Sequence, residues 1–398
     1  MPVSREEVLD ALRPVQDPEL NRSIVDLDMV RAIEVSGGAV TVTVALTVAG
    51  CPLRAEITSR VRGAVGVLGG VDSVDVELTV MTDEQRTALR ERLQGGMVGA
   101  GAGAGSQGGH DHGGGHGGGH EGHDHGAAQP RKTIPFNEPG VKTRVLGIAS
   151  GKGGVGKSSV TVNLALALAK AGHEVAVFDA DVYGFSIPKM LGLDQDPVVI
   201  DGMIVPPVAF GVKAFSMGFL VEEDQPVIWR GPMLHKYLEQ FLTDVYWGEP
   251  DYLLIDMPPG TGDIALSMAQ YLPRAEIYVV TTPQPAAQRV AQRSASMAAK
   301  VNLKVLGVIE NMSWFTGDDG KRYEIFGAGG GQALASKLGV PLAGQVPLVP
   351  ALREGGDDGY PVVAADPTSE AALAFEDIAR FVEQNGPKQI YRPELTIR

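Results

Sequence analysis

A glycine-rich loop between an apolar strand and a helix constrains this 398-residue chain more than any other feature. The apolar run VLGIAS leads into the loop GKGGVGKS at residues 151–158, and a helical pattern begins near Ser159. This is the pattern G-x-x-x-x-G-K-[ST] in the strand, loop and helix context that it requires. Glycines allow backbone N–H groups to close around phosphates, and the helix dipole favours an anion there. The loop therefore predicts a site for nucleotide phosphates on an α/β fold.

Five short apolar runs alternate with helical patterns from about residue 144 onward. The runs are VLGIAS, EVAVFDAD, DYLLIDMP, EIYVVTTP and LKVLGVIEN, and helical stretches at residues 160–171 and 233–245 lie between them. Strands that are almost continuously apolar are typical of a sheet with both faces covered. The pattern predicts a doubly wound, mostly parallel sheet whose ligand lies beyond the carboxyl ends of the strands.

A low-complexity segment separates this fold from a smaller N-terminal unit. Residues 95–129 are glycine-rich, lack aromatic residues and hold six of the eight histidines. Such a segment cannot pack a core, so we expect a flexible linker. Before it, Ser4 and Glu7 form a capping-box pattern, with a helix ending near Pro14, strands at 29–35 and 40–48, a helix at 52–68 and a strand at 74–80. We therefore expect a small α+β domain at 1–94, a linker at 95–135 and the α/β domain at 136–398.

Residues of the loop and of two strand ends have roles that follow from their chemistry. Lys157 is expected to reach the phosphates and Ser158 to ligate Mg²⁺, while Asp256 joins the magnesium shell and Gly260 senses the γ-phosphate through its backbone. Asp181 is the candidate for polarising the attacking water, and Asp179 is a structural residue or a secondary ligand. Strand-end aspartates can also merely cap the next helix. The loop residues expected to contact nucleotide are Gly151, Lys152, Gly153, Gly154, Val155, Gly156, Lys157, Ser158 and Ser159.

The second lysine of the loop, Lys152, is unusual for a phosphate loop. The pattern K-G-G-V-G-K-S resembles the deviant Walker A loop of the P-loop NTPase family that includes MinD, ParA, the nitrogenase iron protein and the arsenite pump ATPase. This resemblance implies that Lys152 reaches across a homodimer to the partner's ATP. A solvated loop lysine is the alternative.

Longer segments resemble one branch of that family, the Mrp (ApbC-like) iron-sulfur cluster carrier ATPases. In the large domain these are VFDADVYGFSIPKMLG, VIWRGPMLHKYLEQFL, WGEPDYLLIDMPPGTGD, VVTTPQPAA and QVPLVPALREGGDDGYPVV. In the small domain, DPEL at 17–20 and GCPL at 50–53 resemble a metal-sulfur assembly domain. The resemblance implies a homodimer that hydrolyses ATP with Mg²⁺ and transfers iron-sulfur clusters to apoproteins, or assists their assembly with other assembly proteins. It also implies that Asn311 contacts adenine, whereas an asparagine that caps a turn is the alternative.

The chain departs from this branch at its cluster ligands. Members have a Cys-x-x-Cys pair shortly after the segment that reads ENMSWF here, but residues 316–320 read TGDDG and Cys51 is the chain's one cysteine. Cluster ligation at the usual place is therefore not available. Cys51 becomes the candidate ligand, because a position just before a helix favours the thiolate. An inert buried cysteine is the alternative.

Histidines in the low-complexity segment give a second metal hypothesis. Two H-x-H pairs could chelate zinc, nickel or iron ions, although a simple solvated linker explains the composition equally well. The six histidines are His110, His112, His116, His120, His123 and His125.

Charge and hydropathy narrow the remaining function classes. With 34 Lys and Arg against 48 Asp and Glu, the net charge of −14 argues against partners held by charge, such as nucleic acid or an anionic membrane. No apolar run approaches the length of a membrane span and the N-terminus is polar, so we expect a cytoplasmic protein. Two alternatives stay open: a regulatory or positioning ATPase like MinD or ParA, and an ATP-dependent adaptor that acts on other carriers without holding a cluster.

Overall fold

A computed structural model describes residues 3–18, 20, 22–47, 54–98, 133–138, 140–182, 184–220, 231–260 and 263–386. The chain divides into two compact units, Met1–Pro135 and Phe136–Arg398. Cys51, the six histidines at 110–125 and most of the segment expected to be a linker lie outside the described residues.

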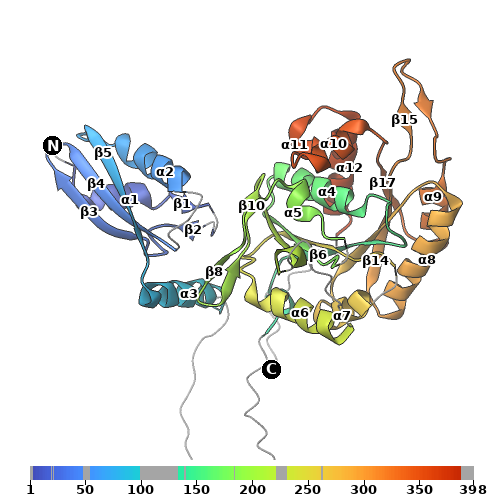
Figure 1. Cartoon of the computed structure of the whole chain (residues 1–398), viewed down its shortest axis with the longest axis horizontal. Helices are drawn as coiled ribbons and strands as arrows, with labels where there is room; N and C mark the ends of the chain where they lie inside the picture. Colours follow the sequence, from blue (N-terminus) through green and yellow to red (C-terminus); the bar gives the residue numbers. More distant parts are fainter. Residues whose placement is uncertain are drawn as a thin grey trace, which may run out of the picture. The chain divides into compact units, whose positions relative to one another are not determined.

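The first unit is a three-stranded sheet covered by helices (Figure 1). Strand β4 is central, antiparallel to β3 and parallel to β5, and its alternate residues Val40, Val42 and Val44 are buried. Helix α1 packs on β3 and helix α2 on β5. The elements are α1 (Arg5–Leu12), β1 (Gln16–Asp17), β2 (Arg22–Ser23), β3 (Val30–Ser36), β4 (Ala39–Leu46), α2 (Arg54–Gly66), β5 (Ser73–Val80) and α3 (Asp83–Val98).

The capping box predicted at the start of the chain is present. The hydroxyl of Ser4 accepts from the backbone N–H of Glu7 at 3.2 Å, and the Glu7 carboxylate accepts from the N–H of Ser4 at 2.8 Å. These hydrogen bonds satisfy backbone donors that the first turn of α1 leaves free.

Helix α3 and the short pair β1 and β2 were not expected from the sequence. Thr82 and Gln85 form a second capping box before α3, with hydrogen bonds of 3.3 and 2.9 Å, and Leu89 and Leu93 are buried one turn apart. The T-x-x-Q pattern is the signal that could have found this helix. Helix α3 continues to Val98, beyond the end that we expected for the small domain.

The second unit is built on an eight-stranded sheet in the order β10-β11-β7-β12-β6-β13-β14-β17. All its pairings are parallel except that of β10 with β11, which confirms the doubly wound, mostly parallel fold. Every residue of β7, β12 and β13 is buried, as the apolar runs predicted. Every residue of β11 is buried too, although no predicted run covered this strand. The strands are β6 (Arg144–Ser150), β7 (Val175–Asp179), β10 (Val208–Ala209), β11 (Val212–Ser216), β12 (Tyr252–Asp256), β13 (Glu276–Thr281), β14 (Lys304–Glu310) and β17 (Leu342–Gln345).

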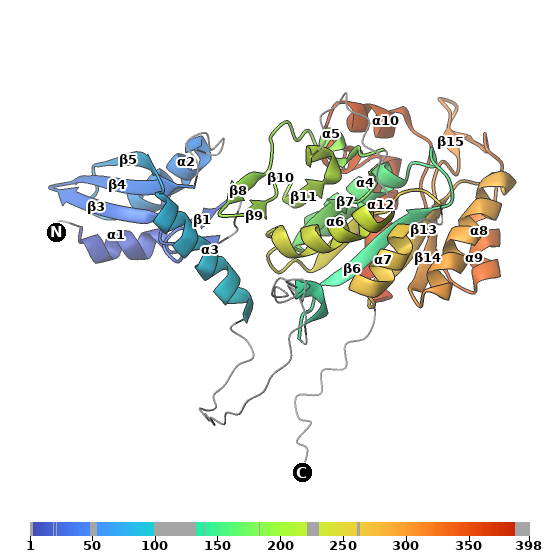
Figure 2. The same ribbon diagram turned by 60° about the horizontal axis from the view of Figure 1, so that its bottom comes forward.

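Helices cover both faces of this sheet (Figures 1 and 2). Helices α4 and α12 pack together on one face, and α6, α7 and α8 follow one another across the other. Helix α8 packs on β13 and α9 on β14, and both views place α8 and α9 beside β14. The helices are α4 (Lys157–Lys170), α5 (Ile187–Met190), α6 (Gly231–Asp244), α7 (Asp263–Tyr271), α8 (Pro285–Lys300), α9 (Gly330–Leu338), α10 (Pro350–Asp357), α11 (Val362–Ala365) and α12 (Glu370–Gln384).

Short elements complete the second unit outside the main sheet. They are the hairpins β8 (Val198–Ile200) with β9 (Met203–Val205) and β15 (Phe315–Thr316) with β16 (Arg322–Tyr323), and the 3-10 turn η2 (Met217–Leu220). A further 3-10 turn, η1 (Pro135–Asn137), begins at the last residue of the first unit. Across the described ranges, no helix combines the length and apolar character that crossing a bilayer requires.

Candidate nucleotide site

Sheet topology gathers the predicted residues at one edge. Strand β12 lies between β6 and β7, with Asp256 opposite Asp179 in the register, and the phosphate loop leaves the end of β6 beside them. An open cavity of about 340 Å³ lies over this edge, lined by most of the phosphate loop together with Asp181 and residues before and within α5. Its volume lies in the range of small-ligand pockets. The cavity therefore lies at the carboxyl ends of the strands, where the sequence predicted the ligand.

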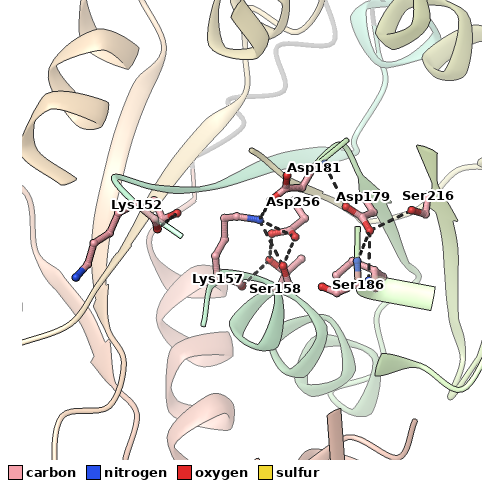
Figure 3. A network of polar contacts seen from close by, with 11 residues as sticks. Lys152, Lys157, Ser158, Asp179, Asp181, Ser186, Ser216 and Asp256 are labelled. Carbon is pink, nitrogen blue, oxygen red and sulfur yellow. Dashed lines mark hydrogen bonds and ion pairs between the residues drawn. The ribbon is translucent and has the colours of Figure 1, made fainter. Parts of the chain in front are cut away.

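Lys157, the first residue of α4, points into a group of acidic side chains (Figure 3). Its Nζ lies 2.8 Å from Asp256 Oδ2 and 3.3 Å from Asp181 Oδ2. All three side chains are buried. Two carboxylates here face one ammonium group, and carboxylate oxygens in such a group are also suited to bind a cation.

Asp256 is also the point where two hydroxyls converge. Ser158 Oγ donates to Asp256 Oδ2 at 2.6 Å and Thr161 Oγ1 donates to Oδ1 at 2.8 Å. Magnesium in nucleotide sites takes a hydroxyl and one or two carboxylates from the protein, and phosphates and water complete its shell. Ser158 and Asp256 therefore fit the magnesium site predicted for them. Thr161 was missed, although it lies one turn after Lys157 on the same helix face.

Asp179 has a different environment from its neighbour Asp181. Its Oδ1 accepts from the N–H of Asp181 at 3.1 Å, and its Oδ2 accepts from the N–H groups of Ser186 and Ile187 and from Ser216 Oγ, at 3.1, 3.3 and 3.1 Å. Burial, with the negative charge of Asp256, raises the pKa of Asp179 to about 7. Both carboxylate oxygens of Asp179 already accept hydrogen bonds from this chain. The geometry therefore favours a structural role for Asp179 over a role as a secondary ligand at the nucleotide site.

Two glycines give the phosphate loop its shape. Gly154 and Gly156 have φ of +77° and +79°, which side chains rarely adopt. A Cβ on Gly156 would also lie 2.2 Å from the side-chain nitrogen of Asn311. The loop therefore has no room for a side chain at the position before Lys157.

Asn311, which follows β14, reaches the phosphate loop. Its Nδ2 donates to the carbonyl of Val155 at 2.9 Å, and its buried Oδ1 has no hydrogen-bond partner among the described residues. The sequence placed Asn311 either at adenine or at a turn, whereas the structure shows that its amide braces the loop. The remaining acceptor Oδ1 is chemically suited to an amino group.

Lys152 is separated from the acidic group. In Figure 3 its ammonium points away from Lys157 and the three aspartates, and its side chain is half-buried. The neighbouring Gly151 lies against α8, because a Cβ there would come within 2.2 Å of the Ala291 nitrogen. Gly153, Ser158 and Ser159 line the cavity.

Residues 316–320, the segment in which the resemblance implies cluster thiolates, lie at the end of β15 and in the turn that leads to β16. Glu370 fastens this hairpin to α12 by accepting from Trp314 Nε1 at 2.9 Å, Thr316 Oγ1 at 2.8 Å and Arg322 at 2.9 Å. Asp319 accepts from the hydroxyl of Tyr323 at 2.8 Å. Among the described residues no group of three or more His, Cys, Asp or Glu side chains is placed to hold a metal ion. Hydrogen-bonded polar side chains thus occupy this position.

A strand, a phosphate loop and a helix, with lysine and serine both on the aspartate of a neighbouring strand, define a P-loop NTPase. Residues 141–383 match the family model described as "NUBPL iron-transfer P-loop NTPase", and residues 5–94 match the model for "Iron-sulfur cluster assembly protein". The chain belongs to the iron-sulfur cluster carrier family of ParA-type P-loop NTPases.

Individual relatives agree with this family. The iron-sulfur cluster carrier protein of Mycobacterium leprae is 48% identical over 380 residues, covering 93% of this chain and 91% of the relative. That of Synechocystis sp. is 41% identical over 387 residues, covering 96% and 97%. A solved structure, the nucleotide-binding protein in complex with ADP from Archaeoglobus fulgidus, has a TM-score of 0.51 and 34% identity, covering 59% of this chain and 93% of that one.

Proposed function

We propose that this chain is a magnesium-dependent ATPase that acts as a homodimer, carries iron-sulfur clusters to apoproteins or assists their assembly, and works in the cytoplasm. The observation that carries the proposal is the convergence of Lys157 and Ser158 on Asp256, at 2.8 and 2.6 Å. This arrangement joins the residue types that hold phosphates and magnesium in nucleotide hydrolysis.

Each group at the site has a separate role in binding and hydrolysing the nucleotide. Backbone N–H groups of residues 153–158 surround the phosphates, and Lys157 moves from its carboxylates to the phosphate oxygens. Ser158 and Asp256 would hold Mg²⁺, and the ion would supply positive charge against the charge that develops on the phosphates. Asp181 is buried beside Lys157 and orients the attacking water. Asn311 braces the loop and offers its Oδ1 to adenine.

The direction of Lys152 supports the homodimer. A half-buried lysine that turns away from the carboxylates of its own site is placed to serve an anion outside this chain. The phosphates of a nucleotide bound to the partner subunit provide such an anion.

The cargo of this chain needs thiolate ligands. Cys51 supplies one per chain and two per homodimer. The other ligands come from the client protein, from small thiols or from the histidines at 110–125. Family membership supports this assignment, because the relatives are iron-sulfur cluster carrier proteins.

A second candidate is an adaptor that uses ATP to act on other carriers. The observation that favours it is the hairpin of β15 and β16, whose described side chains offer no thiolate. An adaptor would hydrolyse ATP without holding a cluster.

ATP hydrolysis by the purified full chain, with and without Mg²⁺, tests the enzymatic part. We expect Mg²⁺-dependent release of phosphate that Asp256→Asn reduces to background. The matched control is Asp318→Asn in the exposed hairpin, which should keep wild-type turnover. Turnover that survives Asp256→Asn would contradict the proposed site.

A further inference from the structure

The backbone N–H and the backbone carbonyl of Gly260, in the loop after β12, each form a hydrogen bond. Its N–H donates to the carbonyl of Ser150 at 2.8 Å, and its carbonyl accepts from Ser294 Oγ of α8 at 3.0 Å. Gly260 has φ of +100°, which glycine adopts readily. The two hydrogen bonds therefore fix the orientation of the two peptide groups of Gly260, a residue type whose backbone can adopt many conformations.

The hydroxyl of Ser294 is a close and specific partner for this carbonyl. Ser294 is only 7% exposed. The void lined by Gly260 and Ser294 measures about 10 Å³, the lower limit of space for a water molecule. If the hydroxyl is removed, the Gly260 carbonyl loses its partner in this conformation.

The N–H of Gly260 has one proton to donate. It donates to Ser150 in the conformation described, so a γ-phosphate must compete with that bond for the same donor. The hydrogen bond from Ser294 lies on the adjoining peptide group and stabilises the same conformation. Each of the two bonds therefore raises the free energy needed to turn Gly260 toward a phosphate.

We propose that Ser294 is a positioning residue that sets how strongly the site discriminates ATP from ADP, because its hydroxyl holds Gly260 toward Ser150. The inference rests on the proposed function, in which the N–H of Gly260 binds the γ-phosphate. ADP has no γ-phosphate, so binding of ADP does not require Gly260 to turn. Loss of the Ser294 hydroxyl should therefore favour ATP alone.

Calorimetric binding of Mg²⁺-ADP and of the Mg²⁺ complex of β,γ-imido-ATP to the full chain tests this inference. We expect Ser294→Ala to tighten the ATP analogue about fivefold, the equivalent of one neutral hydrogen bond, and to leave the Kd of ADP unchanged. Ser294→Thr retains the hydroxyl and should keep the wild-type ratio of the two Kd values. Ser296→Ala, at an exposed position of the same helix, is the matched control and should keep that ratio too.

Three results would overturn the inference. They are an unchanged ratio in Ser294→Ala, an equal weakening of both nucleotides in that variant, and a ratio in Ser294→Thr that shifts as far as in Ser294→Ala. Wild-type protein that binds neither nucleotide would instead overturn the proposed function, and this inference with it.

Discussion

The side chain of Asn311 donates a hydrogen bond of 2.9 Å to the carbonyl of Val155, which ties the end of β14 to the phosphate loop. The same side-chain nitrogen would lie only 2.2 Å from a Cβ on Gly156, too close for a side chain there. The conformation of the loop thus depends on a glycine and on a residue far along the chain.

Replacing Gly156 by alanine should destabilise the folded conformation of the phosphate loop. We expect Gly156→Ala to lower the free energy of unfolding by about 2 kcal/mol or more, since left-handed backbone costs other residues about 1–2 kcal/mol and Asn311 must also move. Gly153→Ala is the matched control, because a methyl group added there would meet no atom within 4 Å and its φ is not in the left-handed region. Urea unfolding followed by tryptophan fluorescence measures both. Equal stabilities of the two variants would show that Asn311 does not confine Gly156.

Alanine substitutions of the two loop lysines should cause different defects. Lys157→Ala removes the cation on Asp256, so we expect nucleotide binding and turnover to be lost. Lys152→Ala should still bind ATP as a monomer but lose about 10³-fold in turnover, the lower range for a positive charge supplied by another subunit. Light scattering with Mg²⁺-ATP and phosphate release separate the two defects. Normal hydrolysis by Lys152→Ala would refute the deviant-loop assignment.

Glu370 should contribute stability that depends on pH. Burial alone would raise the pKa of Glu370, but hydrogen bonds from Thr316 and Trp314 and the charge of Arg322 outweigh it and lower the pKa. An acid whose folded pKa lies below its unfolded value stabilises the fold above the unfolded pKa, and this stability is lost as pH falls through the folded pKa.

We therefore expect Glu370→Gln to lower the free energy of unfolding near neutral pH by ~1 kcal/mol or less, as solvent screens this partly exposed side chain. The difference from wild type should shrink as pH falls below the ordinary pKa of a glutamate. Urea unfolding at a series of pH values measures it, with Asp377→Asn on the exposed side of the same helix as control. A difference that does not depend on pH would show that the charge of Glu370 is irrelevant.

Local patterns predicted most of the second unit. Near-continuous apolar runs located the central strands, and the phosphate loop with its strand ends located Lys157, Ser158 and Asp256, because parallel topology brings strand ends together. The role of Asn311 could not be read from the sequence, since its partner Val155 is 156 positions away. Ser294 was missed for the same reason: a serine in an alanine-rich helix carries no sign of the loop that it contacts.

Anaerobic reconstitution with iron and sulfide tests the central claim, that this chain carries clusters through Cys51, most directly. Visible spectra and the iron to sulfide ratio would be recorded for the wild-type chain beside Cys51→Ser, with ATP hydrolysis measured on the same samples. We predict that the wild type holds a cluster, that the variant does not, and that both hydrolyse ATP. A cluster retained by Cys51→Ser, or none in either protein, would contradict this account, and the second result would leave an ATPase that acts on other carriers.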